Sequence, residues 1–157
     1  PIYYNHLNTG RPVGDFWATS KYFDGQNTPL YPFGYGLSYT SFEYGKPSLS
    51  KAELSGENDA LTLTVPVTNK GEMDGKEIVQ LYVHDPVASI SRPVKELKGF
   101  QKILLNKGET KNVEFRITSS MLKFYNSELN YVAEPGEFEL MVGPNSRDVQ
   151  TLRINYR

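Results

Sequence analysis

The chain contains no cysteine, which excludes disulfide bonds, thiol nucleophiles and thiolate metal sites. It has only two histidines, His6 and His84, and two distant histidines without cysteine do not predict a structural zinc site. His84 ends an expected strand, so we expect a rim side chain that bonds a neighbouring loop. The loop at 69–75 lacks the spacing of a calcium loop and suits a turn held by a bonded Asp. The sequence therefore predicts no metal site and no cofactor.

An excess of charge of either sign is also missing. Lys and Arg number 17, Asp and Glu number 18, and the net charge is −1. No electrostatic footprint therefore points to nucleic acid or to an acidic membrane surface. The apolar runs are only a few residues long, which excludes a transmembrane helix. Neither nucleic acid nor a membrane is expected as a partner.

The N-terminal part of the chain lacks a sustained hydrophobic period but is rich in aromatic residues. Residues 1–28 contain turn-forming residues throughout, together with Tyr3, Tyr4, Phe16, Trp17, Tyr22 and Phe23. A disordered linker is poor in aromatics, so we expect this arm to lie on a surface. The chain starts at Pro1 with no Met and no signal-peptide pattern, and we interpret this start as an excision point.

The arm leads into a segment at 29–44 that we call the strap, with six aromatic residues, two prolines and two glycines. Pro29 and Pro32 fix φ and remove backbone donors, whereas Gly34 and Gly36 allow positive φ or a close backbone approach. The aromatic rings need burial. The strap is therefore expected to be a rigid segment that docks against something larger.

From about residue 41 the pattern is typical of β-structure. The hydrophobic pattern predicts strands at 61–68, 79–83, 97–105, 113–117, 138–142 and 149–156. A further strand is expected near 42–49, and a short hairpin or bent strand within 125–132. Pro66 favours an edge strand or a bulge. Thr118 to Leu122 suits a single helical turn capped by Thr or Ser. Short strands between turn signals predict an all-β, immunoglobulin-like antiparallel sandwich of about seven strands over 41–157, preceded by an irregular arm at 1–40.

Several segments resemble one known family in order. Tyr31-Pro-Phe-Gly-Tyr-Gly-Leu-Ser-Tyr39 resembles the motif that precedes the C-terminal fibronectin type III-like domain of glycoside hydrolase family 3 enzymes. The domain itself is matched by Val65–Gly71, Asp74-Gly75, Gln80–Val83, Ser91–Phe100, Lys107–Glu109, Phe124-Tyr125 and Glu134–Phe138. The segments Tyr4–His6 and Thr9–Pro12 are similar to the exit from the preceding α/β domain.

The resemblance implies a parent enzyme of the β-glucosidase kind, exported to the periplasm or outside the cell, that hydrolyses terminal β-linked sugars with retention. In that family the nucleophile and the acid/base residue lie upstream of this region. No position here matches either motif, so no catalytic residue is assigned. The upstream catalytic domains are the expected partners, and the module's expected function is to stabilise and position them.

Two sets of residues are candidates for binding. Tyr31, Phe33, Tyr35 and Arg92 are candidates for the contact with an upstream domain, whereas Tyr39, Phe42 and Tyr44 are expected to enter the sandwich. Trp17, Tyr22 and Phe23 could stack on sugar rings, or could dock on the neighbouring domain instead. The alternative function is therefore a carbohydrate-binding module that tethers the enzyme to an oligo- or polysaccharide.

Overall fold

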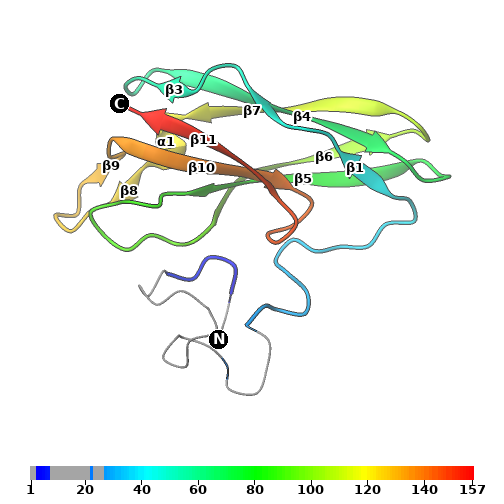
Figure 1. Ribbon diagram of the computed structural model, residues 1–157, viewed down its shortest axis with the longest axis horizontal. Coiled ribbons are helices and arrows are strands. Elements are labelled where there is room, and N and C mark those ends of the chain that lie inside the picture. Colours follow the sequence, from blue (N-terminus) through cyan, green and yellow to red (C-terminus); the bar gives the residue numbers. More distant parts are fainter. Residues whose placement is uncertain (1–2, 8–21, 23–26) are drawn as a thin grey trace.

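The computed structural model describes residues 3–7, 22 and 27–157, and two packed sheets form its body (Figure 1). One sheet contains β1 (Phe42–Tyr44), β2 (Ser48–Leu49), β4 (Ala60–Asn69) and β7 (Thr110–Thr118). The other has the order β3 (Glu53–Leu54), β11 (Gln150–Tyr156), β10 (Gly136–Gly143), β5 (Gly75–His84) and β6 (Glu96–Leu105). The helical turn α1 (Ser119–Leu122) and a hairpin of β8 (Phe124–Tyr125) and β9 (Tyr131–Val132) follow β7. The predicted all-β sandwich is confirmed.

The strand count and one pairing differ from the prediction. Two short strands, β1 and β2, replace the single strand expected near 42–49, and a third, β3, follows where no strand was expected. The chain pairs with β4 through β1 and β2, then crosses to the other sheet, where β3 pairs with β11. That last pairing is parallel, so the sandwich is not wholly antiparallel. The alternation of side chains could not reveal a strand that changes sheets.

The core lies between the two sheets and follows the period-2 pattern. Every second residue of β4 is buried beside its neighbour β7 in the same sheet, and the residues across the core come from β5 and β10. The apolar side chains concerned are Leu61, Leu63, Val65, Val67, Val79, Leu81, Val83, Val113, Phe115, Ile117, Phe138, Leu140 and Val142. Full burial of one such side chain contributes roughly 1.5–3 kcal/mol. This core fixes the face that each strand turns outward.

Pro66 lies in an interior strand, so the prediction of an edge strand or a bulge is wrong. β4 pairs with β7 on one side, in an unbroken register, and with β1 and β2 on the other. Pro66 stands opposite the interval between β1 and β2, where Gly45 N donates to Pro66 O at 2.8 Å. The N and O of one strand residue point to the same side, so the missing N–H faces this interval and removes no bond from the β4–β7 ladder.

The predicted helical turn is α1, but its predicted cap is absent. Thr118 occupies the N-cap position in an extended conformation without a side-chain bond to the turn's backbone. Its hydroxyl instead lies 2.8 Å from that of Ser120. No helix in the described part of the chain is long and apolar enough to span a membrane.

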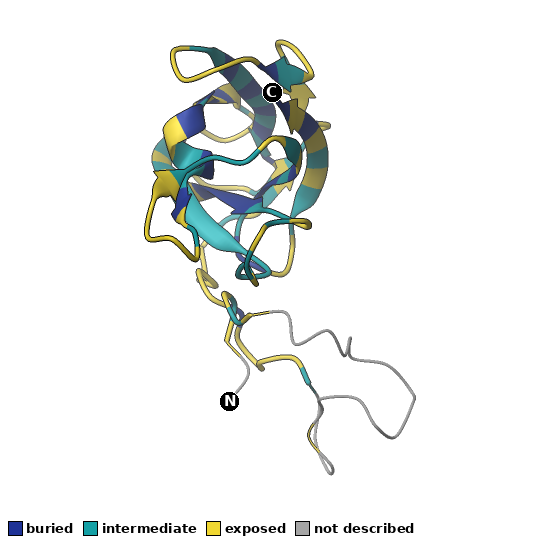
Figure 2. Ribbon diagram, turned by 90° about the vertical axis from the view of Figure 1, so that its left-hand side faces the viewer, coloured by how far each residue is buried: buried dark blue, intermediate teal, exposed yellow. Residues whose placement is uncertain are grey.

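The described parts of the arm run beneath the β5–β10 sheet and are mostly exposed (Figure 2). Contacts with the sandwich are nevertheless specific: Leu7 forms an isolated bridge with Pro93, and Val94 N donates to His6 O at 2.9 Å. In the strap, Phe42 and Tyr44 pack against the core as expected. Tyr39 does not, because 97% of its surface is exposed, and its predicted place in the sandwich is wrong.

Candidate functional site

The junction between the strap and the outer face of β5 is the most highly organised polar site outside the core. Gln80 points away from the core, yet only 4% of its surface is exposed. Its Nε2 donates to Gly34 O at 3.1 Å and to Pro144 O at 2.6 Å, and Tyr82 Oη donates to its Oε1 at 2.5 Å. Gly34 has a φ of 79°, and a Cβ there would overlap the Gln80 side chain. The glycine is therefore required both by its conformation and by the close approach.

Aromatic rings continue this junction. Phe33 stacks on Tyr4 with ring centroids 4.1 Å apart, and Tyr4 meets the edge of Tyr82 at 5.9 Å. Ser146 N donates to Phe33 O at 2.9 Å, which ties the strap to the loop after β10. Tyr82 is consequently fully buried although it lies on the outward face of its strand. Burial raises the pKa of Tyr82 well above its usual range.

The three strap aromatics that sequence reasoning assigned to a domain contact keep much of their surface exposed. The exposed fractions are 67% for Tyr31, 44% for Phe33 and 42% for Tyr35. Tyr31 and Tyr35 pack on each other with centroids 5.3 Å apart, so they form one apolar surface. Exposed aromatic clusters on a rigid support mark interaction sites. A contact with another domain stays a prediction for all three.

Arg92 has its carboxylate partner within this chain. Its guanidinium pairs with Glu96, which also binds Lys98 at 2.6 Å, and it lies over the ring of Phe124 at 4.4 Å. The guanidinium thus joins the loop before β6 to the β8–β9 hairpin. His84, as predicted, bonds this loop, with its Nδ1 3.0 Å from Pro93 O. Whether Arg92 also contacts another domain stays a prediction.

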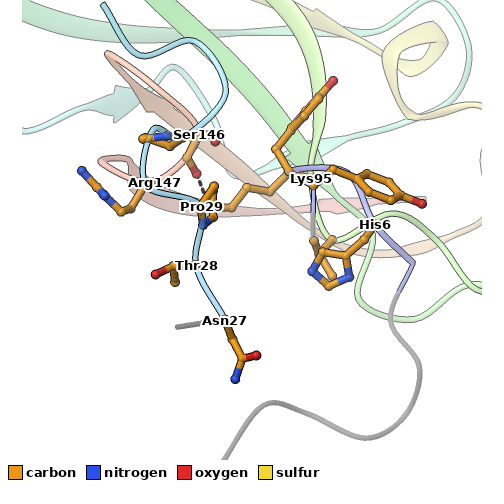
Figure 3. A pocket seen from close by; sticks show the side chains of 11 residues that line it. His6, Asn27, Thr28, Pro29, Lys95, Ser146 and Arg147 are labelled. Carbon is orange, nitrogen blue, oxygen red and sulfur yellow. Dashed lines mark hydrogen bonds between the residues drawn. The ribbon is translucent and has the colours of Figure 1, made fainter. Parts of the chain in front are cut away.

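A cavity of about 210 Å³ lies where the arm meets the sandwich (Figure 3). Tyr4 and His6 line it from residues 3–7, and Lys95 and Arg147 line it from the sandwich loops. The start of the strap region contributes Asn27, Thr28, Pro29 and Pro32. The ammonium of Lys95 donates to Ser146 O at 2.5 Å. Desolvation lowers the pKa of Lys95, because the half-buried ammonium has lost part of its hydration.

The predicted sugar-stacking residues fall mostly outside the described chain. Trp17 and Phe23 lie outside the described residues. Tyr22 is described, 47% of its surface is exposed, and its backbone N donates to Asn27 Oδ1 at 2.7 Å. A sugar platform at these three positions stays a prediction.

The two described carboxylates whose pKa is raised, Glu77 and Asp85, are too far apart to form a hydrolytic pair. Burial raises the pKa of Glu77 and of Asp85, and a raised pKa is the property expected of a carboxyl that acts as a general acid. The two residues lie near opposite ends of β5, and eight residues of strand span roughly 26 Å. Glycosidic carboxylates lie about 5–9.5 Å apart. Within the described residues no group of three or more His, Asp or Glu side chains could hold a metal ion.

Sequence reasoning missed the residues that make the junction, namely Gln80, Tyr82, Lys95 and Tyr4. Gln80 and Tyr82 alternate with the core residues Val79, Leu81 and Val83, and therefore lie on the outward face of β5, which is ordinarily solvated. One available signal was that a large aromatic, Tyr82, and an amide, Gln80, share that face, because the aromatic strap at 29–44 was expected to dock on a surface. The reach of Lys95 toward Ser146 had no signal in the sequence.

Comparison with known proteins places these features in a family. The family model described as "Fibronectin type III-like domain" matches residues 77–146. The periplasmic beta-glucosidase of Salmonella typhimurium is 48% identical over 96% of this chain and 20% of its own length. The thermostable beta-glucosidase B of Acetivibrio thermocellus is 45% identical over 86% of this chain and 18% of its own. A crystal structure of the Listeria innocua beta-glucosidase with gluconolactone matches with a TM-score of 0.92 and 45% identity, covering 99% of this chain and 22% of the other.

The two packed sheets and the docked strap define a β-sandwich module. The chain spans about a fifth of the length of the curated relatives it matches. Residues 77–146 belong to the fibronectin type III-like domain family, and the chain matches a C-terminal region of glycoside hydrolase family 3 β-glucosidases.

Proposed function

We propose that this module supports the catalytic domains of a longer exo-acting glycosidase that removes terminal β-linked sugars with retention. Retention requires two carboxylates about 5–5.5 Å apart. These carboxylates belong to the rest of the polypeptide. Hydrolysis therefore occurs outside the module, which contributes by covering apolar surface and fixing the position of its neighbours. The periplasmic relative from Salmonella typhimurium supports export of the whole protein to the periplasm or beyond.

The observation that carries the proposal is the Tyr31–Tyr35 surface on a strap that is itself held to the sandwich. Gln80 anchors the strap at Gly34, between these two tyrosines. The tyrosines therefore present their exposed rings from a fixed backbone, and little ordering entropy is lost on docking. A loosely attached aromatic segment would bind less well for the same area.

Hydrolysis provides the first test. The 157-residue chain and the full-length polypeptide are each incubated with an aryl β-glucoside, and release of the phenol is followed. The full-length polypeptide should turn over and the chain alone should not. Turnover by the chain at the full-length rate would contradict the assignment.

Docking provides the second test. Tyr31→Ala/Tyr35→Ala is compared with Tyr125→Ala, which removes a tyrosine of similar exposure from the β8–β9 hairpin. Thermal unfolding is measured in the isolated chain and in the full-length polypeptide. The double variant should lower the midpoint more in the full-length polypeptide, by an amount equivalent to about 1–3 kcal/mol. Equal effects in the two contexts would reject the Tyr31–Tyr35 surface as the contact.

The same isolated chain discriminates the alternative of a carbohydrate-binding module. Titration with soluble glucans, followed by Trp17 fluorescence, should show no saturable change if the module is a support. Saturable quenching that is lost in Trp17→Ala would favour the tethering function.

A further inference from the structure

The cavity between the arm and the sandwich contains an uncompensated positive charge. Lys95 and Arg147 are its only permanently charged lining residues among those described, and none of the described lining residues is acidic. Arg147 has a partner, because its Nε lies 3.4 Å from Asp148 Oδ1. Lys95 has no acidic partner among the described residues: its ammonium donates to Ser146 O, and burial is the sole cause of its lowered pKa. One net unit of positive charge therefore remains at the cavity.

An ammonium has three donors, and Ser146 O occupies one of them. Figure 3 shows the Lys95 side chain extended beneath the strap toward Ser146, with His6 and Thr28 on other sides of the cavity. Placing a charge away from water costs free energy unless an opposite charge or further hydrogen bonds compensate it. A lysine held in this position is therefore suited to receive an anionic group from the cavity side.

The net charge and the lining residues of the cavity favour a carboxylate over a phosphate. A carboxylate carries one negative charge, which matches the single unpaired ammonium, whereas a phosphate monoester carries close to two at neutral pH. The apolar faces of Tyr4, Pro29 and Pro32 suit a carbon skeleton attached to the carboxylate. Asn27 and Thr28 add neutral hydrogen-bonding groups that a hydroxylated ligand could use. The volume of about 210 Å³ limits the ligand to one small ring or side chain.

We propose that this cavity binds a carboxylate group through the ammonium of Lys95. The carboxylate comes from one of two sources. A free acidic sugar such as a hexuronate would make the cavity a ligand site of the module. An Asp or Glu side chain from the rest of the longer polypeptide would make it a charged anchor of the docking described above. The second source rests on the proposed function, and the first does not.

The first arm of the test uses glucuronate and glucose, which differ at a single carbon as carboxylate and alcohol. Each is titrated into the 157-residue chain while nuclear magnetic resonance follows the Lys95 side chain and the cavity backbone. The variants are Lys95→Met and, as a matched control, Lys102→Met, which removes an exposed lysine from β6. A free-ligand site predicts saturable shifts with glucuronate that persist in Lys102→Met, are lost in Lys95→Met and are absent with glucose.

The second arm measures thermal unfolding of the same two variants in the isolated chain and in the full-length polypeptide. A side-chain source predicts that Lys95→Met lowers the midpoint more in the full-length polypeptide than in the chain, whereas Lys102→Met shifts both equally. Lys95→Arg, which keeps the charge, should recover part of the difference. The proposal is overturned if glucuronate does not bind and Lys95→Met has equal effects in both contexts. The Tyr31→Ala/Tyr35→Ala comparison shows separately whether docking itself has failed.

Discussion

The side-chain amide of Gln80 in β5 donates a hydrogen bond to the backbone oxygen of Gly34 in the strap, across 46 residues of sequence. The same nitrogen donates to Pro144 O, so one side chain joins the strap, β5 and the loop after β10. Each of these acceptors is a backbone oxygen that is satisfied by a fixed partner. The strap is thereby made part of the sandwich surface.

Gly34→Ala should release the strap. A Cβ at this position overlaps the Gln80 amide and strains a backbone with a φ of 79°. We expect a loss of about 1–3 kcal/mol in the free energy of unfolding, measured by urea denaturation. Gly36→Ala is the matched control, because no heavy atom lies within 4 Å of its ideal Cβ. Equal stability of the two variants would show that the Gly34 contact contributes nothing.

Deletion of residues 1–40 should destabilise the sandwich. It removes the ring of Tyr4 from Tyr82 and the oxygen of Gly34 from Gln80, so both buried side chains become exposed. An exposed tyrosine face and a lost buried bond together cost about 2–4 kcal/mol. Differential scanning calorimetry measures the shift in midpoint.

A second variant tests whether the lost stability comes from this contact. In the truncated chain, Gln80→Leu should destabilise less than in the intact chain, because the Gly34 partner is already gone. An unchanged midpoint after truncation would mean that the arm rests on other domains alone.

Much of the sandwich was predictable because its signals are local. The alternation of Leu61, Leu63, Val65 and Val67 identified β4 and its buried face directly from the sequence. Turn residues and the ordered family motifs identified the rest. The crossing of the chain from β2 to β3 was not predictable, since it depends on which sheet edge is vacant.

The site was less predictable than the fold, because its residues are distant in sequence. Gln80 and Tyr82 lie on the outward face of β5, and their burial depends on Tyr4 and Gly34, which are distant in sequence. Arg92 was a candidate for a contact with another domain, which stays a prediction, and its pairing with Glu96 within the chain was not foreseen. In both cases the partner was set by tertiary contacts that no local pattern encodes.

Arg92→Met should destabilise the chain by about 1–2 kcal/mol, because it removes the cation from the face of Phe124. Glu96 keeps Lys98 as a partner, so the carboxylate is not left unpaired and the loss stays moderate. A double-mutant cycle with Phe124→Leu measures the coupling between ring and cation. Additive effects of the two substitutions would show that the stacked contact carries no energy.

Glu77→Gln should raise stability at neutral pH and leave it unchanged in acid. Burial raises the pKa of Glu77 above its ordinary 4.5, although hydrogen bonds from Ile78 N at 3.0 Å and Tyr44 Oη at 3.2 Å oppose the shift. The folded state therefore holds the proton more tightly than the unfolded state. The contribution of the protonated Glu77 carboxyl to the free energy of unfolding is complete below about pH 4.5 and is lost as the pH rises through the raised pKa of Glu77. The wild type should consequently weaken relative to Glu77→Gln across that window.

Urea unfolding of both proteins between about pH 4 and pH 8 measures this difference. The pKa values of Asp59 and Glu109 are lowered, so these carboxyls affect stability only at a pH below their ordinary pKa. Both proteins contain them, so their contribution cancels in the comparison. Tyr44→Phe should steepen the dependence, because it removes a donor that stabilises the Glu77 carboxylate. In Tyr44→Phe/Glu77→Gln the dependence on this window should disappear. If the difference in the free energy of unfolding between the two proteins does not change with pH, or increases toward acid pH, the titrating group is not Glu77.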